Sequence, residues 1–454
     1  MPAKQVAQVN GISSIQRRYN VMRRIIFFIA LFIPTFQIHA RESEQVISGR
    51  VVDERNGVGI PGVTIYTSDG RSCTGSNEDG EYTLGVACST EVAVVFSAFG
   101  YLRDTVACTR LSRQPTVRLK PGGLELKEVS IEALTPHSLL DEVLKRIPDN
   151  YRVDTTRNRY FSRYCYVAND SVYLFYENVL ESVRTGYGKL DGKRRINYDD
   201  TRKRQLGNYN TVLQSRLLIC DSVFLYKLIR NRYRVREMLS YNDNNAIADP
   251  VEAPNAHVML DKRHRKKFKM TLSEIDDSLG SGHYKLTMKG MDKTIGLVIN
   301  PADYAITSIT IEQDTGTTIF PASKTYRERH PLAKQTCRQR RTEYRYDIVN
   351  GKYTLVSYSF HNIFTDVCHN EYRWKDAPTV QEFQSTGIVQ LIGQTDAHDL
   401  PEDVFDLEIQ KTSFDQIATR YSQYDATFWQ GISYPPIPKS MKNTVNATLR
   451  RLDD

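Results

Sequence analysis

Few residues of this 454-residue chain combine the types and the spacing that catalysis requires. A serine hydrolase needs its nucleophile on a tight turn, usually Gly-x-Ser-x-Gly. The nearest stretch is SLGSGHYK, which contains Ser281 and His283 but lacks that spacing and lies between two strand-like runs. We interpret it as a turn and predict no catalytic residue.

Metal and cofactor sites also lack a sequence signature. After a leader of 40 residues, no two histidines are closer than seven residues and no His-Glu-x-x-His motif is present, so a metal site would need distant histidines to converge. Asn77, Glu78 and Asp79 could begin a calcium loop, but the spaced acidic ligands and the distal glutamate are missing. The glycine pairs at 122–123 and 186–188 lack the lysine and hydroxyl of a phosphate-binding loop. We predict no metal and no cofactor.

Basic residues cluster in three runs. These are KRRINYDDTRKR at 193–204, DKRHRKKFK at 261–269 and RQRRTEYR at 338–345. They could contact anionic envelope material such as lipopolysaccharide phosphates, but the favoured interpretation is solvated strand edges that lysine and arginine protect from pairing. The 27 tyrosines are likewise assigned to sheet surfaces rather than to a sugar-stacking platform.

The first forty residues predict export. Arg23 and Arg24 precede an apolar run from 25 to 36 that is too short for the roughly 20 residues of a membrane-spanning helix, and a polar stretch then ends at Ala40. We expect a signal peptide over 1–40, cleaved after Ala40, with Met22 as an alternative start. No cysteine lies near the cut to carry a lipid anchor. The product is therefore expected in the periplasm, at the outer membrane or at the cell surface, with at most peripheral membrane association.

Export also limits the partners. Nucleic acid is excluded, and the formal charge of +8 falls to +3 because the leader holds five basic and no acidic residues. That balance does not require a polyanionic partner.

The seven cysteines are Cys73, Cys88, Cys108, Cys165, Cys220, Cys337 and Cys368. One bridge could form among the three between 73 and 108, but unpaired buried or edge thiols are the favoured interpretation.

From Gln45 to Leu119, short apolar runs alternate with turn residues every eight to twelve positions, which is typical of an antiparallel β-sandwich. The pattern predicts seven strands and almost no helix. The run EVAVVFSA at 91–98 is apolar on both faces and is expected to be central. Asp69-Gly70 and Asp79-Gly80 are interpreted as hairpin turns, in which glycine supplies the positive φ.

This stretch resembles the carboxypeptidase-regulatory-like domain, a transthyretin-like sandwich common in secreted Bacteroidetes proteins. The likeness covers about 90 residues and is carried by GRVVDERNGVGIPGVTIY, GSNEDGEYTL, VVFSAFGYLRDTV and VRLKPGGLELKEVSI. The signature positions are Gly49, Pro61, Gly62, Asp79, Gly80, Tyr82, Gly100 and Tyr101. A Gly-Thr pair usual before the Asp-Gly turn is replaced by RSCTGSNEDG. The resemblance implies an accessory module without peptidase activity, in which these residues are structural.

The sequence pattern changes after residue 132. TPHSLLDEVLKRIPDNY predicts a helix over 136–147 that Thr135 caps, and aromatic strands flank Asn169-Asp170. Residues 217–240 are predicted to be helical, and strands dominate from 266 to 394, with turns at NPAD and Asn350-Gly351. The polar last sixty residues are expected to pack loosely.

The predicted fold class is mainly β, with a seven-stranded transthyretin-like sandwich before a larger α+β domain that has a curved antiparallel sheet. The expected divisions are the signal peptide 1–40, the sandwich 45–120, a linker 121–135, the sheet domain 136–400 and a polar extension 401–454. The larger region resembles the uncharacterised region that follows this sandwich in Bacteroidetes outer-envelope proteins, and its strand pattern resembles the half-barrel of periplasmic lipoprotein carriers.

These features favour a noncatalytic envelope protein that binds a glycan, a lipid or a protein partner. A hydrolase whose site is assembled from distant residues is the first alternative, and a lipid- or lipoprotein-carrier-like protein is the second. A fragment of an outer-membrane receptor ranks last, because the chain lacks the length and the aromatic girdles of a membrane barrel. The short helix at 136–147 cannot hide a large sheet, so we expect either cover by 217–240 or a groove for a lipid or apolar peptide.

Overall fold

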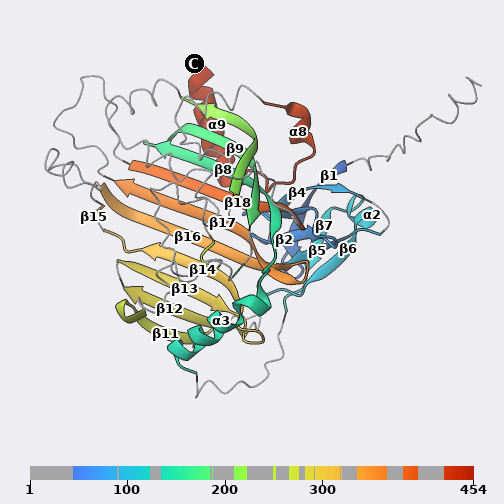
Figure 1. Cartoon of the computed structure of the whole chain (residues 1–454). Coiled ribbons are helices and arrows are strands. Elements are labelled where there is room, and N and C mark those ends of the chain that lie inside the picture. Colours follow the sequence, from blue (N-terminus) through green and yellow to red (C-terminus); the bar gives the residue numbers. More distant parts are fainter. Residues whose placement is uncertain are drawn as a thin grey trace, which may run out of the picture. The chain divides into compact units, whose positions relative to one another are not determined.

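The computed structural model describes residues 44–88, 91–122, 134–184, 187, 209–221, 249–251, 265–275, 282–290, 292–316, 318–319, 335–365, 382–396 and 424–453. Residues 45–454 form one compact unit. Strands dominate it, as Figure 1 shows, so the predicted fold class is confirmed. Among the described residues, no helix is long and apolar enough to cross a membrane. The predicted signal peptide lies outside the described residues.

The sandwich consists of two small sheets. Its strands are β1 (Glu44–Asp53), β2 (Thr64–Thr67), β3 (Cys73–Gly75), β4 (Glu81–Ala87), β5 (Ala93–Ser97), β6 (Asp104–Ala107) and β7 (Thr116–Leu119), with helix α2 (Cys108–Leu111) before β7. The sheet orders are β4-β1-β7 and β3-β2-β5-β6, so β5 is interior as predicted. The pairing of β1 with β7 is parallel, unlike the antiparallel arrangement expected, because after five intervening strands and α2 the chain runs beside the second half of β1 in the same direction.

The two Asp-Gly turns differ from each other. Gly70 has a φ of 68° and joins the paired strands β2 and β3, as predicted for a hairpin. Gly80 has a φ of 77°, but it joins β3 to β4, which belong to different sheets, so the hairpin interpretation is wrong at this turn. The turn instead packs on β1: the Val51 amide donates to the Gly80 carbonyl at 2.8 Å.

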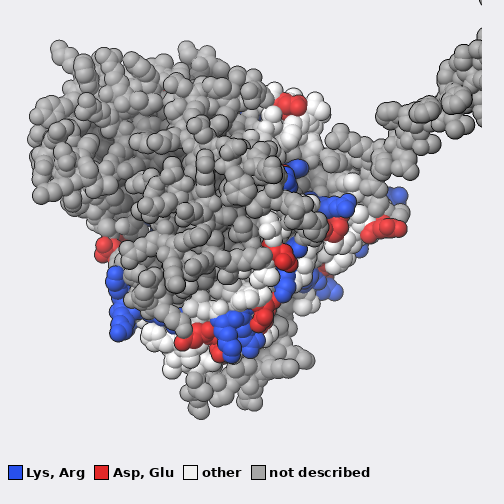
Figure 2. Space-filling view, viewed as in Figure 1, with Lys and Arg blue, Asp and Glu red and all other residues white. Residues whose placement is uncertain are grey.

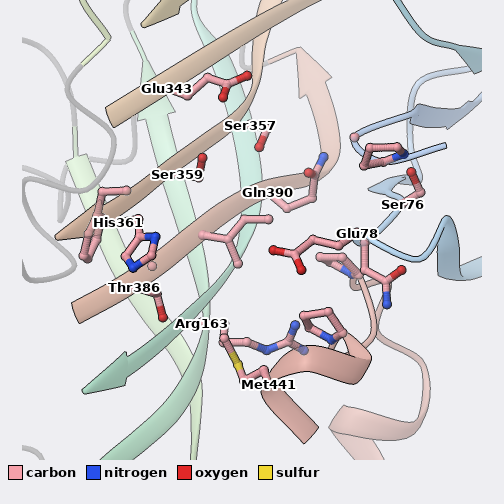
Figure 3. Close-up of a pocket in the computed structure, with 18 of the residues that line it drawn as sticks. Ser76, Glu78, Arg163, Glu343, Ser357, Ser359, His361, Thr386, Gln390 and Met441 are labelled. Atoms are coloured by element: carbon pink, nitrogen blue, oxygen red, sulfur yellow. The ribbon is translucent and has the colours of Figure 1, made fainter. Parts of the chain in front are cut away.

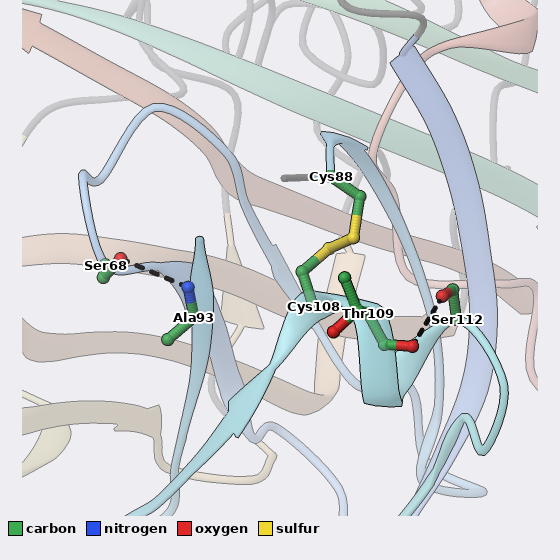
Figure 4. Close-up of a disulfide and its surroundings, with 6 residues drawn as sticks. All are labelled: Ser68, Cys88, Ala93, Cys108, Thr109 and Ser112. Carbon is green, nitrogen blue, oxygen red and sulfur yellow. Dashed lines mark hydrogen bonds between the residues drawn. A yellow bond between two sulfur atoms is a disulfide. The ribbon is translucent and has the colours of Figure 1, made fainter. Parts of the chain in front are cut away.

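A disulfide joins Cys88 and Cys108 (Figure 4). The favoured interpretation of these two as unpaired thiols is therefore wrong. Cys88 follows β4 and Cys108 follows β6, and the crossing of the two sheets brings their Cα atoms to 5.6 Å, within the usual range for a bridge. Cys73, Cys165 and Cys337 are buried free thiols. Burial raises the pKa of the Cys165 thiol to about 12, so it stays protonated.

The second part of the unit is a large antiparallel sheet. Its strands are β8 (Thr156–Ala168), β9 (Ser171–Arg184), β10 (Tyr209–Cys220), β11 (Lys269–Glu274), β12 (Tyr284–Gly290), β13 (Lys293–Ile299), β14 (Ile306–Gln313), β15 (Thr318–Ile319), β16 (Gln335–Val349), β17 (Lys352–Thr365) and β18 (Glu382–Asp396). The order is β10-β9-β8-β18-β17-β16-β14-β13-β12-β11, and β15 pairs with β16. The predicted turns at Asn169-Asp170, NPAD and Asn350-Gly351 join paired strands. However, β18, the last strand among the described residues, inserts between β8 and β17, so the sheet is not a simple meander.

Helix α3 (Pro136–Asn150) opens this part and lies beside β11 (Figure 1). As predicted, Thr135 caps it: the Ser138 amide donates to the Thr135 hydroxyl at 3.1 Å. Four residues of its apolar stripe are buried in the main core, namely Leu139, Leu140, Val143 and Ile147. The helix predicted over 217–240 is wrong at its start, because 217–220 belong to β10, and residues 222–240 lie outside the described part.

The C-terminal segment (residues 424–446) contains α8 (Ala426–Gln430) and the first half of α9 (Lys439–Asp453). The expectation of loose packing is wrong here. Trp429 is only 4% exposed and packs with Ile432 against Phe161 of β8. Tyr434 pairs with Thr83 of β4 through two backbone hydrogen bonds. The few apolar residues of a polar stretch thus cover a strand face and link it to the sandwich.

Candidate functional site

The two faces of β17 have different chemistry. Alternate side chains of a strand point to opposite faces, so Tyr358 and Phe360 share one face, and Ser357, Ser359 and His361 share the other. Both aromatic side chains are buried in the main core, whereas the two serines and the histidine are half-buried. A strand with one fully packed face and one polar face is suited to carry a site.

Neighbouring strands extend the polar face. In the register of β18 with β17, Gln390 lies opposite Ser357 and Thr386 lies opposite His361. We use the name polar face for Arg163 of β8, for Arg341, Glu343 and Arg345 of β16, for Ser357, Ser359 and His361 of β17, and for Thr386, Ile388 and Gln390 of β18. Residues directly opposite each other in such pairs have Cβ atoms about 5 Å apart. Four chain segments thus place their side chains within reach of one small ligand.

A cavity of about 320 Å³ lies on the polar face. Figure 3 shows Ser357, Ser359, His361 and Thr386 on the sheet side, Ser76 and Glu78 on the sandwich side, and Met441 from α9. Three prolines of the C-terminal segment also line it: Pro435, Pro436 and Pro438. The sheet therefore forms one wall, and the sandwich loop 76–78 and the C-terminal segment form the others.

Hydrogen bonds hold the sandwich loop and the C-terminal segment together. The Asn77 side-chain amide donates to the Pro436 carbonyl at 3.3 Å, and the Lys439 amide donates to the Asp79 carboxylate at 2.8 Å. From the sheet, Arg163 also donates to the Pro436 carbonyl, at 3.3 Å. The Pro436 carbonyl thus accepts hydrogen bonds from both the sandwich loop and the sheet at the edge of the cavity.

The charged groups of the polar face are paired with one another. Arg163 donates to Glu177 of β9 at 2.6 Å, and Glu177 also accepts from Arg216 of β10. Arg345 donates to Glu343 at 2.5 Å. Arg341 lies 3.0 Å from Glu312 and 3.6 Å from Glu343. Among the described residues, the arginines at the cavity thus have carboxylate partners, whereas the Glu78 carboxylate, which also lines the cavity, accepts a hydrogen bond from Ser440 and has no ion pair.

Three hydroxyl groups, by contrast, are uncommitted. Within the described part of the chain, Ser357, Ser359 and Thr386 line the cavity without a hydrogen bond from their side chains to the protein. The imidazole of His361 also lines it. Burial lowers the pKa of His361 and the Glu78 carboxylate opposes that shift, so the ring is neutral at pH 7.

The groups that line the cavity can bind a ligand. Among the described residues, no hydrogen bond joins a hydroxyl of the cavity to His361, although nucleophilic catalysis uses such a contact. The same residues contain no cluster of His, Cys, Asp or Glu that could hold a metal ion. The free hydroxyl groups can donate and accept hydrogen bonds, and the prolines offer apolar contact.

Comparison with known proteins identifies the sandwich. Residues 47–131 match the family model of the CarboxypepD_reg-like domain. The sandwich is a domain of this type. No curated protein matches the chain.

Several solved structures match part of this chain at low identity. A LolA superfamily protein from Nitrosomonas europaea is 10% identical with a TM-score of 0.22, and the match covers 60% of this chain and 98% of that one. A domain described as an outer membrane lipoprotein-sorting protein from Vibrio parahaemolyticus is 6% identical with a TM-score of 0.26, and covers 61% of this chain and 100% of that one. TM-scores this low do not show a shared fold.

Some signature residues of the regulatory-like domain lie at the cavity. Pro61 and Gly62 line it, and the Gly62 carbonyl accepts from Arg345 at 3.4 Å. Asp79 and Gly80 form the turn that adjoins loop 76–78, and Asp79 bonds to the C-terminal segment. These positions therefore connect the domain to the sheet as well as shaping its turns.

The other signature residues lie inside the regulatory-like domain. The buried Tyr82 donates its hydroxyl to the Pro115 carbonyl at 2.8 Å, and a side chain at Gly49 would place its Cβ 2.1 Å from that same oxygen. Gly100 has a φ of 80°, and the next residue, Tyr101, donates to Asp53 at 3.0 Å. A structural role for these residues remains our prediction.

The remaining sequence candidates do not gather into a site. Ser281 lies outside the described residues. The His283 ring packs edge-on against the Phe99 ring, with 4.9 Å between the two ring centroids. The carboxylate of Glu78 accepts from Ser440 at 3.0 Å. Together with the contacts of Asn77 and Asp79 given above, this commits the polar side chains of the supposed calcium loop to the C-terminal segment.

Two of the basic runs differ from the predicted solvated strand edges. The run at 338–345 lies in β16, which is interior, and two of its arginines, Arg341 and Arg345, form ion pairs on the polar face. Arg265 in the second run is buried and donates to Asp141 of α3 at 2.7 Å. The run at 193–204 lies outside the described residues. Basic and acidic side chains are interspersed over the described surface drawn in Figure 2.

Sequence reasoning missed the polar face itself. The run LVSYSFHN at 355–362 alternates polar with aromatic residues, which is a visible signal of a strand with one polar face. That pattern does not indicate which segments cover the face. The cover comes from the sandwich loop and the C-terminal segment, which are distant in sequence.

Proposed function

We propose that this chain is an exported, noncatalytic binding protein of the cell envelope, whose ligand occupies the cavity on the polar face. The observation that carries the proposal is the set of three uncommitted hydroxyl groups in a cavity of about 320 Å³ that the sandwich, the sheet and the C-terminal segment enclose. This volume is at the small end of the roughly 300–1,000 Å³ of ligand pockets. The predicted domain boundaries and the predicted structural role of the signature residues belong to the same proposal.

Blocking the cavity tests this function. Ser359→Trp fills the space without changing the strand pairing, and Thr271→Trp on the exposed face of β11 is the matched control. Residues 41–454 would be sedimented with peptidoglycan sacculi, with purified lipopolysaccharide and with phospholipid vesicles. We expect retention on one of these materials, lost in Ser359→Trp and kept in the control. Equal retention of both variants would contradict a binding role for the cavity.

The export part of the proposal has its own test. Amino-terminal sequencing of the protein recovered from a periplasmic or membrane fraction should begin at Arg41, as cleavage after Ala40 requires. A cytoplasmic product with an intact leader would contradict it.

A hydrolase is the second candidate, and one observation favours it. The neutral His361 lies directly opposite Thr386 in the β17–β18 pair, so a ligand between them could bring a hydroxyl and a base into reach. If the material retained by the cavity is cleaved, and His361→Asn retains binding but abolishes cleavage, the hydrolase would replace the binding protein as the better function.

A further inference from the structure

We propose that the cavity recognises a neutral carbohydrate, as a small saccharide or the end of a glycan chain. This inference rests on the cavity being the ligand site proposed above and names the class of ligand. It follows from the uncommitted groups, from the pairing of the charges, from the opposite wall and from the strands that carry the site.

The uncommitted groups match a polyol. Ser357, Ser359 and Thr386 each offer one donor and two acceptor positions, as does every hydroxyl of a sugar. They lie on adjacent strands, with Thr386 two positions in register from the pair of Ser359. Thr386 lies four register positions from Ser357, about 13 Å along the strands, so a ligand that carries hydroxyls along its length, such as a disaccharide, can bond to all three. A ligand with a single polar group would leave at least two of them unpaired.

An anionic ligand fits less well, and the Glu78 carboxylate that lines the cavity would repel it. Each arginine at the cavity already has a carboxylate partner: Arg163 has Glu177, and Arg345 has Glu343. An anion would have to leave water without a free cation to compensate its charge, and that desolvation opposes binding. One Nη2 atom of Arg163 is without a partner among the described residues, but it is buried and not accessible from the cavity.

The opposite wall suits the apolar side of a sugar ring. Pro435, Pro436, Pro438 and Met441 line the cavity and face it with hydrocarbon. A pyranose ring presents C–H groups on its faces and hydroxyls at its rim, so it can pack against the prolines and bond to the sheet at the same time. An acyl chain would match the prolines but would bury the three hydroxyls without hydrogen-bond partners, which is unfavourable.

A peptide has no strand edge to pair with at this site. Extended peptides bind by adding a strand to an exposed edge. The polar face belongs to β16, β17, β18 and β8, which are interior strands whose backbone groups already bond to their neighbours. Recognition here must therefore use side chains, as saccharide binding does.

The test measures binding of neutral saccharides to residues 41–454 on a glycan array, followed by calorimetric titration with the strongest binder. Maltose, cellobiose and N,N′-diacetylchitobiose are included, with digalacturonic acid, dialanine and a dansyl fatty acid as comparators. We expect a neutral saccharide to bind and each of Ser359→Ala and Thr386→Val to weaken it about three- to tenfold, the loss of one hydrogen bond. Ser273→Ala and Thr271→Val on β11 are matched controls and should bind as the unmodified protein does.

The outcomes separate this inference from the proposed function. Variants are compared only at equal melting temperature, and Ser357→Ala replaces either one that is destabilised. If a comparator binds with the same dependence on Ser359 and Thr386 while no neutral saccharide does, the carbohydrate assignment is overturned and the cavity remains the ligand site. If no probe depends on these hydroxyls, both proposals are overturned.

Discussion

The two faces of β17 and β18 share one backbone but differ in role: one face packs in the core, and the other lines the cavity. On the apolar face, Phe360 meets Tyr164 of β8 at 6.1 Å between ring centroids, across Gly387, where a Cβ would lie 2.3 Å from the Phe360 ring. On the polar face, the hydroxyl groups of Ser359 and Thr386 have no hydrogen-bond partner among the described residues. Because successive side chains of a strand point to opposite faces, one face of a sheet can carry the core packing while the other carries hydroxyl groups that are available to a ligand.

The largest expected effect comes from the apolar face. Phe360→Ala removes a buried ring that also packs near Tyr358, and truncations of this kind cost about 3–5 kcal/mol because a cavity remains. The free energy of unfolding is measured in urea, with Ser359→Ala as the control on the opposite face. The control should lose less than about 1 kcal/mol, since its hydroxyl has no partner to lose. Similar losses in both variants would contradict the division between the faces.

The ion pairs under the polar face should contribute the next largest effect. Glu177→Gln leaves Arg163 and Arg216 without a counter-charge, and Arg163 is only 4% exposed. Removing one partner of a buried pair costs about 3 kcal/mol. Urea denaturation measures the loss, and Glu312→Gln, whose partner Arg341 is half exposed, is the control that should change stability by less than about 1 kcal/mol. A Glu177→Gln protein as stable as the control would mean that water reaches this pair.

The turn beside the cavity should give a smaller loss. Gly80→Val puts a β-branched residue at a φ of 77° and its Cβ 2.4 Å from the Val51 carbonyl oxygen, so we expect a loss of about 2 kcal/mol. Gly57→Val has a similar φ of 70° but open space around it, and it should lose about 1 kcal/mol. Thermal unfolding compares the two. A Gly80→Val protein with unchanged melting but no ligand binding would make this turn part of the site rather than a support for it.

The sandwich could be predicted from sequence because its signals are local. Each strand is bounded by turn residues a few positions away, and glycines such as Gly70 and Gly80 mark where the chain must adopt a positive φ. What failed there was long-range: the parallel pairing of β1 with β7, and the bridge between Cys88 and Cys108, depend on how the two sheets stack.

The candidate site could not be predicted, because its geometry depends on contacts between distant segments. The alternation in β17 reveals a polar face, but the position of Thr386 depends on the insertion of β18 between β8 and β17. The cover depends on Pro436, which meets Asn77 of the sandwich and Arg163 of the sheet. The polar, proline-containing sequence of the C-terminal segment does not indicate such contacts. Its buried Trp429 is one of few apolar residues in a stretch whose composition predicts loose packing.

The smallest expected effect is a pH dependence that belongs to the polar face alone. Burial lowers the pKa of His361 below its usual 6.5, and the Glu78 carboxylate partly offsets the shift. The unfolded chain therefore binds a proton at this residue before the folded protein does, so its contribution is complete above pH 6.5 and is lost as the pH falls toward the lowered value. His361→Asn removes the proton-binding group, so the melting temperature of the variant should fall less between pH 7.5 and pH 5.5 than that of the unmodified protein. All other histidines contribute equally to both proteins. Tyr358→Phe, the control on the apolar face, should retain the original dependence. If His361→Asn shows the same fall as the unmodified protein, His361 is hydrated in the folded state, and the polar face is more open to water than its half-buried side chains indicate.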